Sequence, residues 1–176
     1  MSSLGLESGT VRVVRYDPSW PELYIAEAAR LSTVLSRHGV RAMLEHTGST
    51  AVPGLVAKPV LDILAGRNIE DSRDAVIEAI EAAGYQYRGE QGIPGRDFFR
   101  RGNPRQYHIH LTHVGSEFWI DHLAFRDYLR VNPEAAERYA VLKLELAAAH
   151  PHDREAYIEG KTDFVHSILA ASRERQ

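Results

Sequence analysis

The sequence contains no cysteine, which excludes disulfide bonds and thiolate metal sites. It has no apolar run long enough to cross a membrane, and its formal net charge of -3 gives no general argument for nucleic-acid binding. The opening stretch MSSLGLESG lacks the basic leader and the apolar segment of a secretory signal. We therefore expect a cytoplasmic protein without a membrane partner, and find no evidence for a nucleic-acid partner.

The length and composition are those of one ordinary domain. The chain has 176 residues, 44% of them hydrophobic and 26% charged, which is enough for a substantial hydrophobic core. We predict a single domain over residues 1–176, with residues 1–9 as a flexible tail. Nine histidines are many for this length, and four of them fall in one short region: His108, His110, His113 and His122.

The pattern of apolar residues and breakers predicts an α/β (α+β) domain. Extended segments are expected at residues 11–14, 41–46, 58–65, 85–88, 97–101 and 106–113. Helices are expected at residues 16–39, 71–84, 116–131, 133–149 and 154–172. The Gly- and Pro-rich segment GEQGIPG at 89–95 suits a mobile loop. The sequence thus predicts one small mixed sheet with helices packed on it and a helical C-terminal third.

The stretch HTGSTAVPGLVAKPVLDIL, residues 46–64, contains turn-forming residues beside an apolar strand. It is not a Walker A loop, because five residues separate Gly48 from Gly54 and Leu55 follows in place of lysine. It is not a nucleophile elbow either, because Ser49 directly follows Gly48 and lacks a second glycine at the required spacing. Neither of these two catalytic motifs is present.

A phosphate cradle remains possible in this stretch. Backbone N–H groups at the Gly48–Ser49 turn can hold a phosphate with help from the serine hydroxyl. The returning strand would place Asp62 beside the turn, on the same face as Lys58 and Leu64. A carboxylate there can hold a metal that bridges phosphates. Similar turn formers also occur in α/β loops that bind nothing, and Lys58 could simply begin the strand.

The spacing of this turn and of the aspartate in the next strand resembles the nucleotidyltransferase superfamily motif. The segments EHTGSTAVPGLVAKPVLDIL, YDPSWP, HIHL and LAFRDYLR together resemble the GrpB family, over about residues 11–170. The resemblance implies a nucleotidyltransferase-like fold with Gly48, Ser49 and Thr50 at a nucleotide phosphate site. Family members also occur fused to dephospho-CoA kinase, which indicates a nucleotide context.

The chain departs from active members of the superfamily, which carry a second acid two residues after the first. Leu64 occupies that position here, and it cannot ligate one of two Mg²⁺ ions. The third acid position falls on QYHIHL, where His108 and His110 share a face at roughly 7 Å spacing. Imidazoles favour transition metals over Mg²⁺. Either Asp62 and a histidine, His110 in our assignment, hold one metal, or the chain binds nucleotide without turnover.

Two simpler interpretations of these side chains stay open. The histidines of H-I-H can be residues of a half-exposed strand that bond to nearby acids. Glu45 is a rival carboxylate, but it points away from the face of His46, and we expect it to pair with an arginine.

Basic residues on the C-terminal helices are further candidates for phosphate contacts. Helical spacing puts Arg126 and Arg130 on one stripe with Phe118 and His122. The two arginines could clamp a triphosphate, or they could belong to a solvated face and pair with nearby aspartates. Lys143 and Lys161 each follow a tyrosine by four residues and interrupt an apolar stripe. Because the GrpB pattern carries basic residues there, we expect both lysines to contact phosphate.

The first functional hypothesis is metal-dependent transfer of a nucleoside monophosphate from an NTP to an unknown acceptor. Asp62 and His110 would hold Mg²⁺ or Mn²⁺, and His108 or His110 would act as base. The phosphates would lie against the following residues: Gly48, Ser49, Thr50, Lys58, Arg126, Arg130, Lys143 and Lys161. The alternative is a catalytically degenerate module that binds a nucleotide or a CoA-type phosphate ligand. A third hypothesis is a metal hydrolase built on Asp62, His108 and His110.

Overall fold

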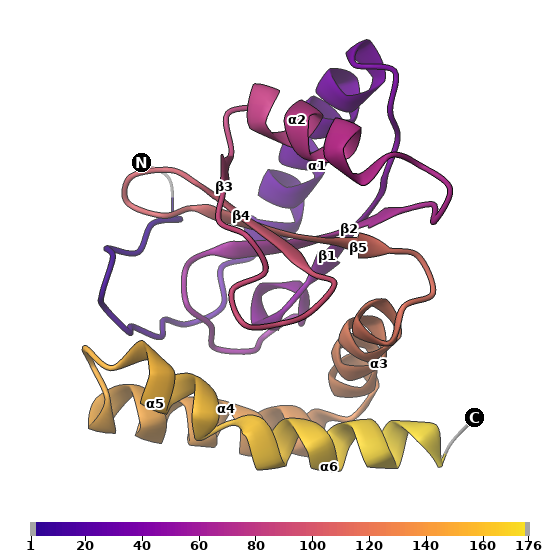
Figure 1. Ribbon diagram of the computed structural model, residues 1–176. Helices are drawn as coiled ribbons and strands as arrows, with labels where there is room; N and C mark the ends of the chain where they lie inside the picture. The colour runs from indigo at the N-terminus through magenta and orange to yellow at the C-terminus, as the bar shows by residue number, and fades with distance from the viewer. Residues whose placement is uncertain (1–2, 175–176) are drawn as a thin grey trace.

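The computed structural model describes residues 3–174 and shows a mixed α/β domain. Its strands are β1 (Met43–Thr47), β2 (Leu61–Arg67), β3 (Gln86–Tyr87), β4 (Asp97–Arg101) and β5 (Tyr107–His113). Its helices are α1 (Trp20–Arg37), the 3-10 turn η1 (Ser49–Ala51), α2 (Arg73–Ala82), α3 (Glu117–Val131), α4 (Pro133–Ala149), α5 (Arg154–Glu159) and α6 (Thr162–Arg173). The predicted mixed sheet and helical C-terminal third are confirmed (Figure 1).

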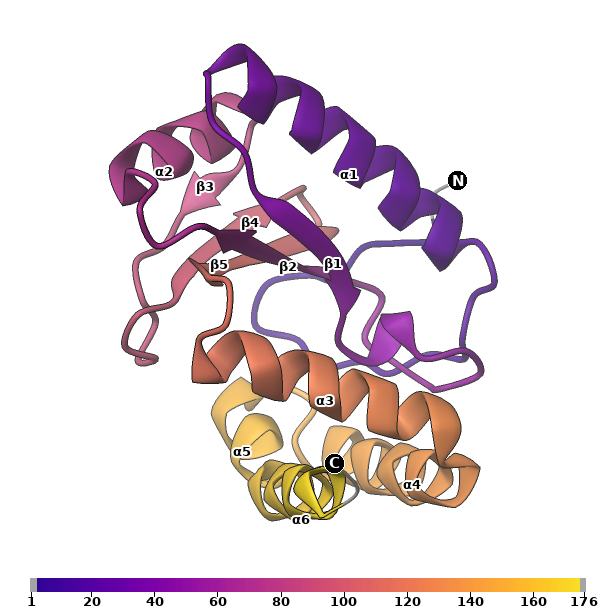
Figure 2. The same cartoon turned by 90° about the vertical axis from the view of Figure 1, so that its right-hand side faces the viewer.

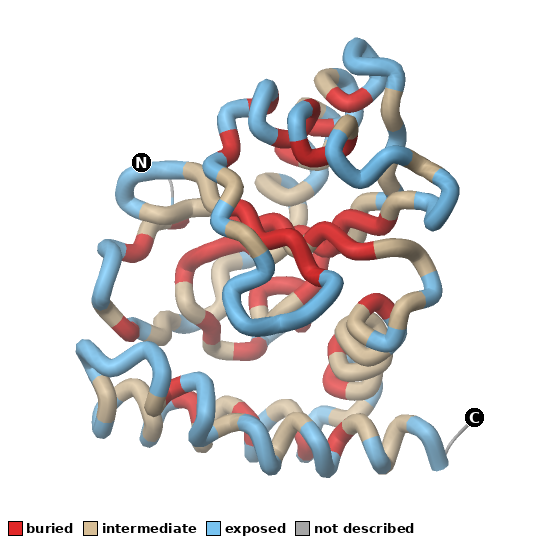
Figure 3. The backbone as a smooth tube through the Cα atoms, viewed as in Figure 1, coloured by how far each residue is buried: buried red, intermediate tan, exposed pale blue. Residues whose placement is uncertain are grey.

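The sheet separates two helical layers. Its strand order is β1-β2-β5-β4-β3, and β2 and β5 are the parallel pair while the other neighbours are antiparallel. Helices α1 and α2 cover one side of the sheet, while α3 to α6 form a layer on the other (Figures 1 and 2). The central strands are therefore buried from both sides (Figure 3).

Alternation along β2 divides its side chains between the two layers. Ile63 and Ala65 belong to the core cluster that β2 forms with α1 and α2. Gly66 lies on the opposite face, where an added Cβ would be 2.5 Å from the Trp119 ring of α3. Asp62 shares this second face, so the carboxylate points toward the C-terminal helical layer.

Two of the predicted strands differ from the observed ones. Residues 11–14 form no strand, because Val14 makes only an isolated bridge to Ala57. Strand β2 begins at Leu61 instead of residue 58, since Pro59 has no N–H to donate to a ladder.

The last predicted helix, 154–172, is divided into α5 and α6. Gly160 ends α5 where the chain packs closely on α4, and a Cβ there would lie 2.5 Å from Leu146 Cδ2. Gly160 and Lys161 separate α5 from α6, although the dihedral angles of both residues stay in the right-handed helical region.

Part of the segment predicted to be a flexible tail, residues 1–9, packs on the rest of the fold. Leu4 and Leu6 are buried, and Leu6 forms a backbone bridge with Arg105. Gly5 N also donates to the Pro59 carbonyl at 2.9 Å. Apolar burial thus fixes this segment against the sheet, while residues 1–2 lie outside the described residues. None of the helices within residues 3–174 is both long and apolar enough to cross a bilayer.

Candidate functional site

The Gly48 turn connects the end of β1 to η1 and lies against Asp62. Thr47, the last residue of β1, pairs with Asp62 in the antiparallel register. Gly48 then adopts φ 70°, a conformation that side-chain-bearing residues rarely adopt. A Cβ at this position would lie 2.7 Å from Asp62 Oδ2. Glycine is therefore required both by the backbone and by the close approach of the carboxylate.

Substitution of Gly48 with alanine is expected to destabilise the fold by about 1–3 kcal/mol, because it combines a left-handed backbone with a contact against a charged oxygen. Urea unfolding monitored by circular dichroism measures this change. Gly54→Ala is the matched control, since Gly54 also has a positive φ but its added Cβ would meet no atom within 4 Å. Equal losses in the two variants would mean that contact with Asp62 contributes nothing.

Every lysine of the chain lines one small pocket beside this turn. Only three of the 21 Lys and Arg residues are lysines, namely Lys58, Lys143 and Lys161. The pocket has a volume of about 140 Å³ and its lining also includes the following residues: Gly48, Ser49, Thr50, Val60, Asp62, Tyr139 and Tyr157. The predicted positions from the turn, from β2 and from the C-terminal helices therefore meet in one place.

Lys143 is the most buried of these cations, with 2% of its surface exposed. Its Nζ donates a hydrogen bond to Ser49 Oγ at 2.8 Å and another to the Val56 carbonyl. It also lies 4.6 Å from the centre of the Tyr139 ring. These contacts join α4 directly to the Gly48–Ser49 turn.

The other two lysines share one aromatic surface. Lys161 Nζ lies 4.5 Å from the centre of the Tyr157 ring, and Lys58 Nζ lies 5.3 Å from it. An aromatic face attracts cations, so Tyr157 helps to hold two like charges near each other. The spacing of the two tyrosines is visible in the sequence, but their place in the pocket is not. The rarity of lysine is the signal that would have identified this cluster.

Burial and nearby positive charges lower the pKa values of all three amines. Burial, then Lys161 and Lys58, lowers the pKa of Lys143 to about 6. Burial and Lys58 lower the pKa of Lys161 to about 7 in spite of Asp62, and burial lowers that of Lys58 to about 8. An anion in the pocket would favour the charged form of each amine. The pocket is therefore suited to a ligand that brings negative charge.

Asp62 joins the pocket to the histidines of β5. Its Oδ1 lies 3.1 Å from His108 Nδ1 and 3.3 Å from His110 Nε2. Although burial raises the pKa of Asp62, these hydrogen bonds hold it well below its usual range. Burial lowers the pKa of His108. An ionised Asp62 accepts from both rings, which leaves His108 Nε2 and His110 Nδ1 as the nitrogens with lone pairs.

The donors beside Asp62 do not fit a two-metal centre. Leu64 is fully buried on the face of Asp62, at the position where a second acid would be needed. Within residues 3–174, no group of three or more His, Asp or Glu side chains is arranged to hold a metal ion. The predicted metal ligands Asp62 and His110 do lie together, but as hydrogen-bonding partners of each other.

The predicted arginines lie outside the pocket and support the fold. Arg126 donates to Glu45 Oε2 at 2.7 Å and also pairs with Asp127, which agrees with the ion pair expected for Glu45. Arg130 Nε donates to the Ala51 carbonyl at 2.9 Å. Arg126 also donates to the His46 carbonyl, so the two guanidinium groups brace the ends of the turn rather than lining the pocket.

Several known proteins resemble this chain over most of its length. The family profile described as "GrpB protein" matches residues 10–171. The glutamate-rich protein GrpB of Alkalihalophilus pseudofirmus is 33% identical over 172 residues, which cover 94% of this chain and 98% of that protein. UPF0157 protein YqkA of Bacillus subtilis is 38% identical over 156 residues, covering 88% of this chain but 45% of that protein. The chain thus spans less than half the length of this second relative.

Solved structures show the same fold. The crystal structure of conserved protein GrpB from Enterococcus faecalis has a TM-score of 0.82 and 36% identity, covering 93% of this chain and 98% of that one. The Cid1 poly(U) polymerase has a TM-score of 0.53 at 16% identity, covering 78% of this chain and 44% of the polymerase, which shows a shared nucleotidyltransferase fold. The chain belongs to the GrpB family.

Proposed function

We propose that the chain binds a nucleoside triphosphate with its phosphates in the lysine pocket and transfers the nucleoside monophosphate to an acceptor. The observation that carries this proposal is the meeting of all three lysines of the chain at the Gly48–Ser49 turn, with Asp62 as the one carboxylate in the pocket lining. A phosphate chain supplies the negative charge that the closely spaced amines lack. The likeness to the nucleotidyltransferase fold supports a nucleotide as the source of that charge.

The proposed reaction is displacement at the α-phosphorus. An acceptor hydroxyl oxygen forms a bond to this phosphorus, the bond to the oxygen that bridges the α- and β-phosphates breaks, and pyrophosphate leaves. The lysines stabilise the charge that develops on the leaving group. The proton of the acceptor goes to His108 Nε2, while Asp62 fixes the orientation of that ring through Nδ1.

The divalent ion in this proposal, Mg²⁺ or Mn²⁺, would reach the site bound to the triphosphate. Mg²⁺ in nucleotide sites commonly takes its ligands from substrate phosphates, water and one or two carboxylates. Asp62 is the carboxylate that the pocket offers for this purpose.

The second candidate is a binding module without turnover. Leu64, fully buried where a second acid would be needed, favours it. A CoA-type ligand is one choice, because a dephospho-CoA kinase of Mycolicibacterium paratuberculosis is 28% identical over a gapped alignment of 187 positions, which covers 92% of this chain and 46% of that protein. Such a ligand would also place phosphates against the lysines.

Thermal unfolding with ATP, GTP, CTP, UTP or dephospho-CoA, each with Mg²⁺, Mn²⁺ or neither, tests both candidates. At a concentration about a hundred times its Kd, a ligand adds roughly 2.7 kcal/mol of stability, or several degrees in Tm. We expect an NTP to raise the Tm of the wild-type chain and to raise that of Lys161→Met by less. The control Arg138→Met removes an exposed cation from α4 and should keep the full increase in Tm. Pyrophosphate release then distinguishes transfer from binding. No shift with any of the nucleotides would overturn the transferase proposal.

A further inference from the structure

A second cavity, of about 210 Å³, opens beside the lysine pocket and is lined by four arginines. They come from separate parts of the chain: Arg88 follows β3, Arg100 is in β4, Arg105 precedes β5, and Arg154 begins α5. His108 also lines this cavity, and its Nδ1 bonds to Asp62 of the lysine pocket. The His108–Asp62 pair thus connects the two cavities.

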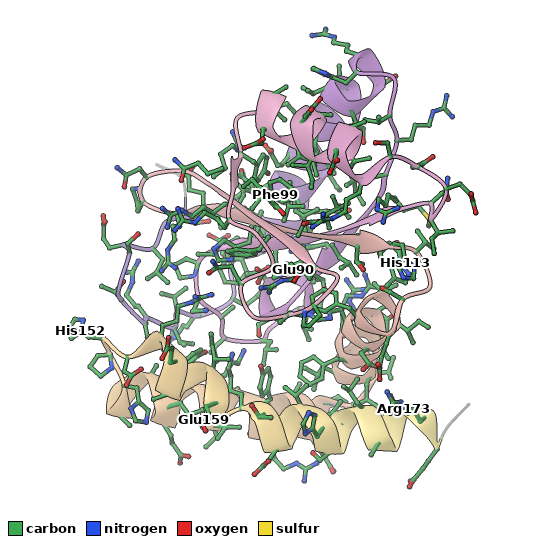
Figure 4. All side chains as sticks on the ribbon, in the orientation of Figure 1. Glu90, Phe99, His113, His152, Glu159 and Arg173 are labelled. Atoms are coloured by element: carbon green, nitrogen blue, oxygen red, sulfur yellow. The ribbon has the colours of Figure 1, made fainter. Side chains whose placement is uncertain are left out.

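None of these arginines forms an ion pair with a carboxylate in the part of the chain that the structure describes. The lining of the cavity includes no Asp or Glu residue. Within residues 3–174, the arginines that form ion pairs are others: Arg30, Arg73, Arg101, Arg126, Arg130 and Arg173. Glu90, labelled in Figure 4 on the β3–β4 loop, instead accepts from the Gly95 N–H at 2.8 Å. The four cations therefore line one cavity without an ion-pair partner, and Asp62 of the lysine pocket is the carboxylate whose charge raises the pKa of Arg105.

The fold holds two of these cations in place with neutral groups. Arg105 donates to the carbonyls of Leu6 and Glu7 at 3.2 and 3.0 Å, and Arg100 Nε donates to Gln86 Oε1 at 3.2 Å. Burial, followed by the nearby Arg154 and Arg100, lowers the pKa of Arg105. Repulsion of this kind is relieved when an anion occupies the space between the cations. The N-terminal segment that was expected to be a flexible tail is part of this arrangement.

The size of the cavity indicates a group rather than a whole ligand. Sites for complete small molecules commonly have volumes of about 300–1,000 Å³, and this cavity has about 210 Å³. Arginine presents planar paired donors that match the oxygens of a phosphate. A phosphate group has both the charge and the size to fit between the four side chains.

We propose that this arginine cavity binds the phosphate group of the acceptor, which is then a phosphorylated small molecule with a free hydroxyl. The inference rests on the proposed function and adds the chemical class of the second substrate. With its phosphate among the arginines, the acceptor lies next to His108, on the side opposite to the Asp62 contact. The nucleotide in the lysine pocket and the acceptor in the arginine cavity then meet at the His108–Asp62 pair.

The test is an NMR titration of the full chain with inorganic pyrophosphate, with ¹³Cε-labelled lysine and ¹⁵Nε-labelled arginine. The three lysine signals report on the lysine pocket, and arginine signals report on the cavity. We expect two binding events in the wild-type chain. Arg88→Ala/Arg154→Ala, which changes two exposed residues, is expected to weaken the arginine event at least tenfold. The lysine event should change by much less, because Arg154 acts on Lys58 and Lys161 from outside the lysine pocket. Arg154→Gln alone should give a smaller loss at the same signals.

The matched control is Arg37→Ala/Arg41→Ala, which removes the same charge from exposed positions at the far end of α1 and the loop after it. Both binding events should persist in this control. An arginine event that is absent from the wild type, or is lost equally in the control, would overturn the proposed cavity. If the wild-type chain shows the arginine event without the lysine event, the result would contradict the proposed nucleotide site and would still support the arginine cavity.

Discussion

Replacing Lys143 with methionine is expected to stabilise the free protein near neutral pH and to weaken phosphate binding by at least about tenfold, the effect of losing one charge-assisted hydrogen bond. The amine is 2% exposed, and burial together with Lys161 and Lys58 lowers its pKa to about 6. Methionine keeps the unbranched shape without the desolvated amine. The same group that binds phosphate thus destabilises the empty pocket.

The sign of the pH dependence follows from the pKa of Lys143. Its pKa of about 6 in the folded protein is below the ordinary lysine value of 10.5, so between these pH values the unfolded chain binds more protons at this position. The contribution of Lys143 to stability therefore increases with pH through this window. The stability advantage of the methionine variant should be greatest near pH 6, on the order of several kcal/mol, and should shrink toward pH 9.

Urea unfolding of both proteins at pH 6, 7, 8 and 9 measures this difference, because groups common to the two proteins cancel. Arg138→Met is the control, since Arg138 is exposed on the same helix. The three lysines also allow direct titration of their ¹³Cε signals. A Lys143 signal that titrates near the ordinary lysine value, or a stability difference that grows with pH, would contradict the prediction.

The core of the site could be predicted from local pattern. The Gly48–Ser49 turn, Asp62 in the next strand and the lysines in apolar helix stripes are all visible in the sequence, and the pocket contains them. Turn chemistry and strand alternation act over a few residues, so such features are readable without the fold. The two extra tyrosines are visible in the same way, because each precedes a pocket lysine by four residues.

The roles of the arginines could not be read in this way, since they depend on partners distant in sequence. Arg126 and Glu45 are 81 residues apart, and helical spacing alone does not show that they meet. The helical stripe of Arg126 and Arg130 was expected to clamp a triphosphate. These arginines instead donate hydrogen bonds to backbone carbonyls on either side of the Gly48–Ser49 turn. The arginine cavity likewise combines residues from four parts of the chain, which only the packed sheet brings together.

The burial of Leu64 changes how the enzyme and the binding module can be distinguished. The substitution Leu64→Asp would restore the missing acid, but this side chain is fully buried between the sheet and the helical layer. An aspartate there would cost stability through desolvation before it affected any reaction. Asp62 is the better position for this comparison, because its side chain is 30% exposed and lines the pocket.

Asp62→Asn is expected to reduce turnover by about 10²–10⁴-fold and to leave nucleotide binding intact, because removal of the carboxylate charge disturbs the orientation and proton affinity of the base. The amide has nearly the same shape, so contact with the Gly48 turn is retained. In the absence of a divalent ion, phosphate binding should be equal or tighter, since the one carboxylate facing the lysines is neutralised.

Pyrophosphate release, with the nucleotide that binds and a panel of phosphorylated hydroxyl acceptors, measures turnover, and thermal unfolding without metal measures binding. Asp74→Asn, an exposed substitution in the first turn of α2, should change neither. Equal turnover in the Asp62 variant and the wild type would remove the carboxylate from the mechanism. Loss of binding together with turnover would show that Asp62 maintains the pocket itself. Retained binding with lost turnover requires that the charge of Asp62 acts on the reacting groups, as the His108–Asp62 geometry predicts.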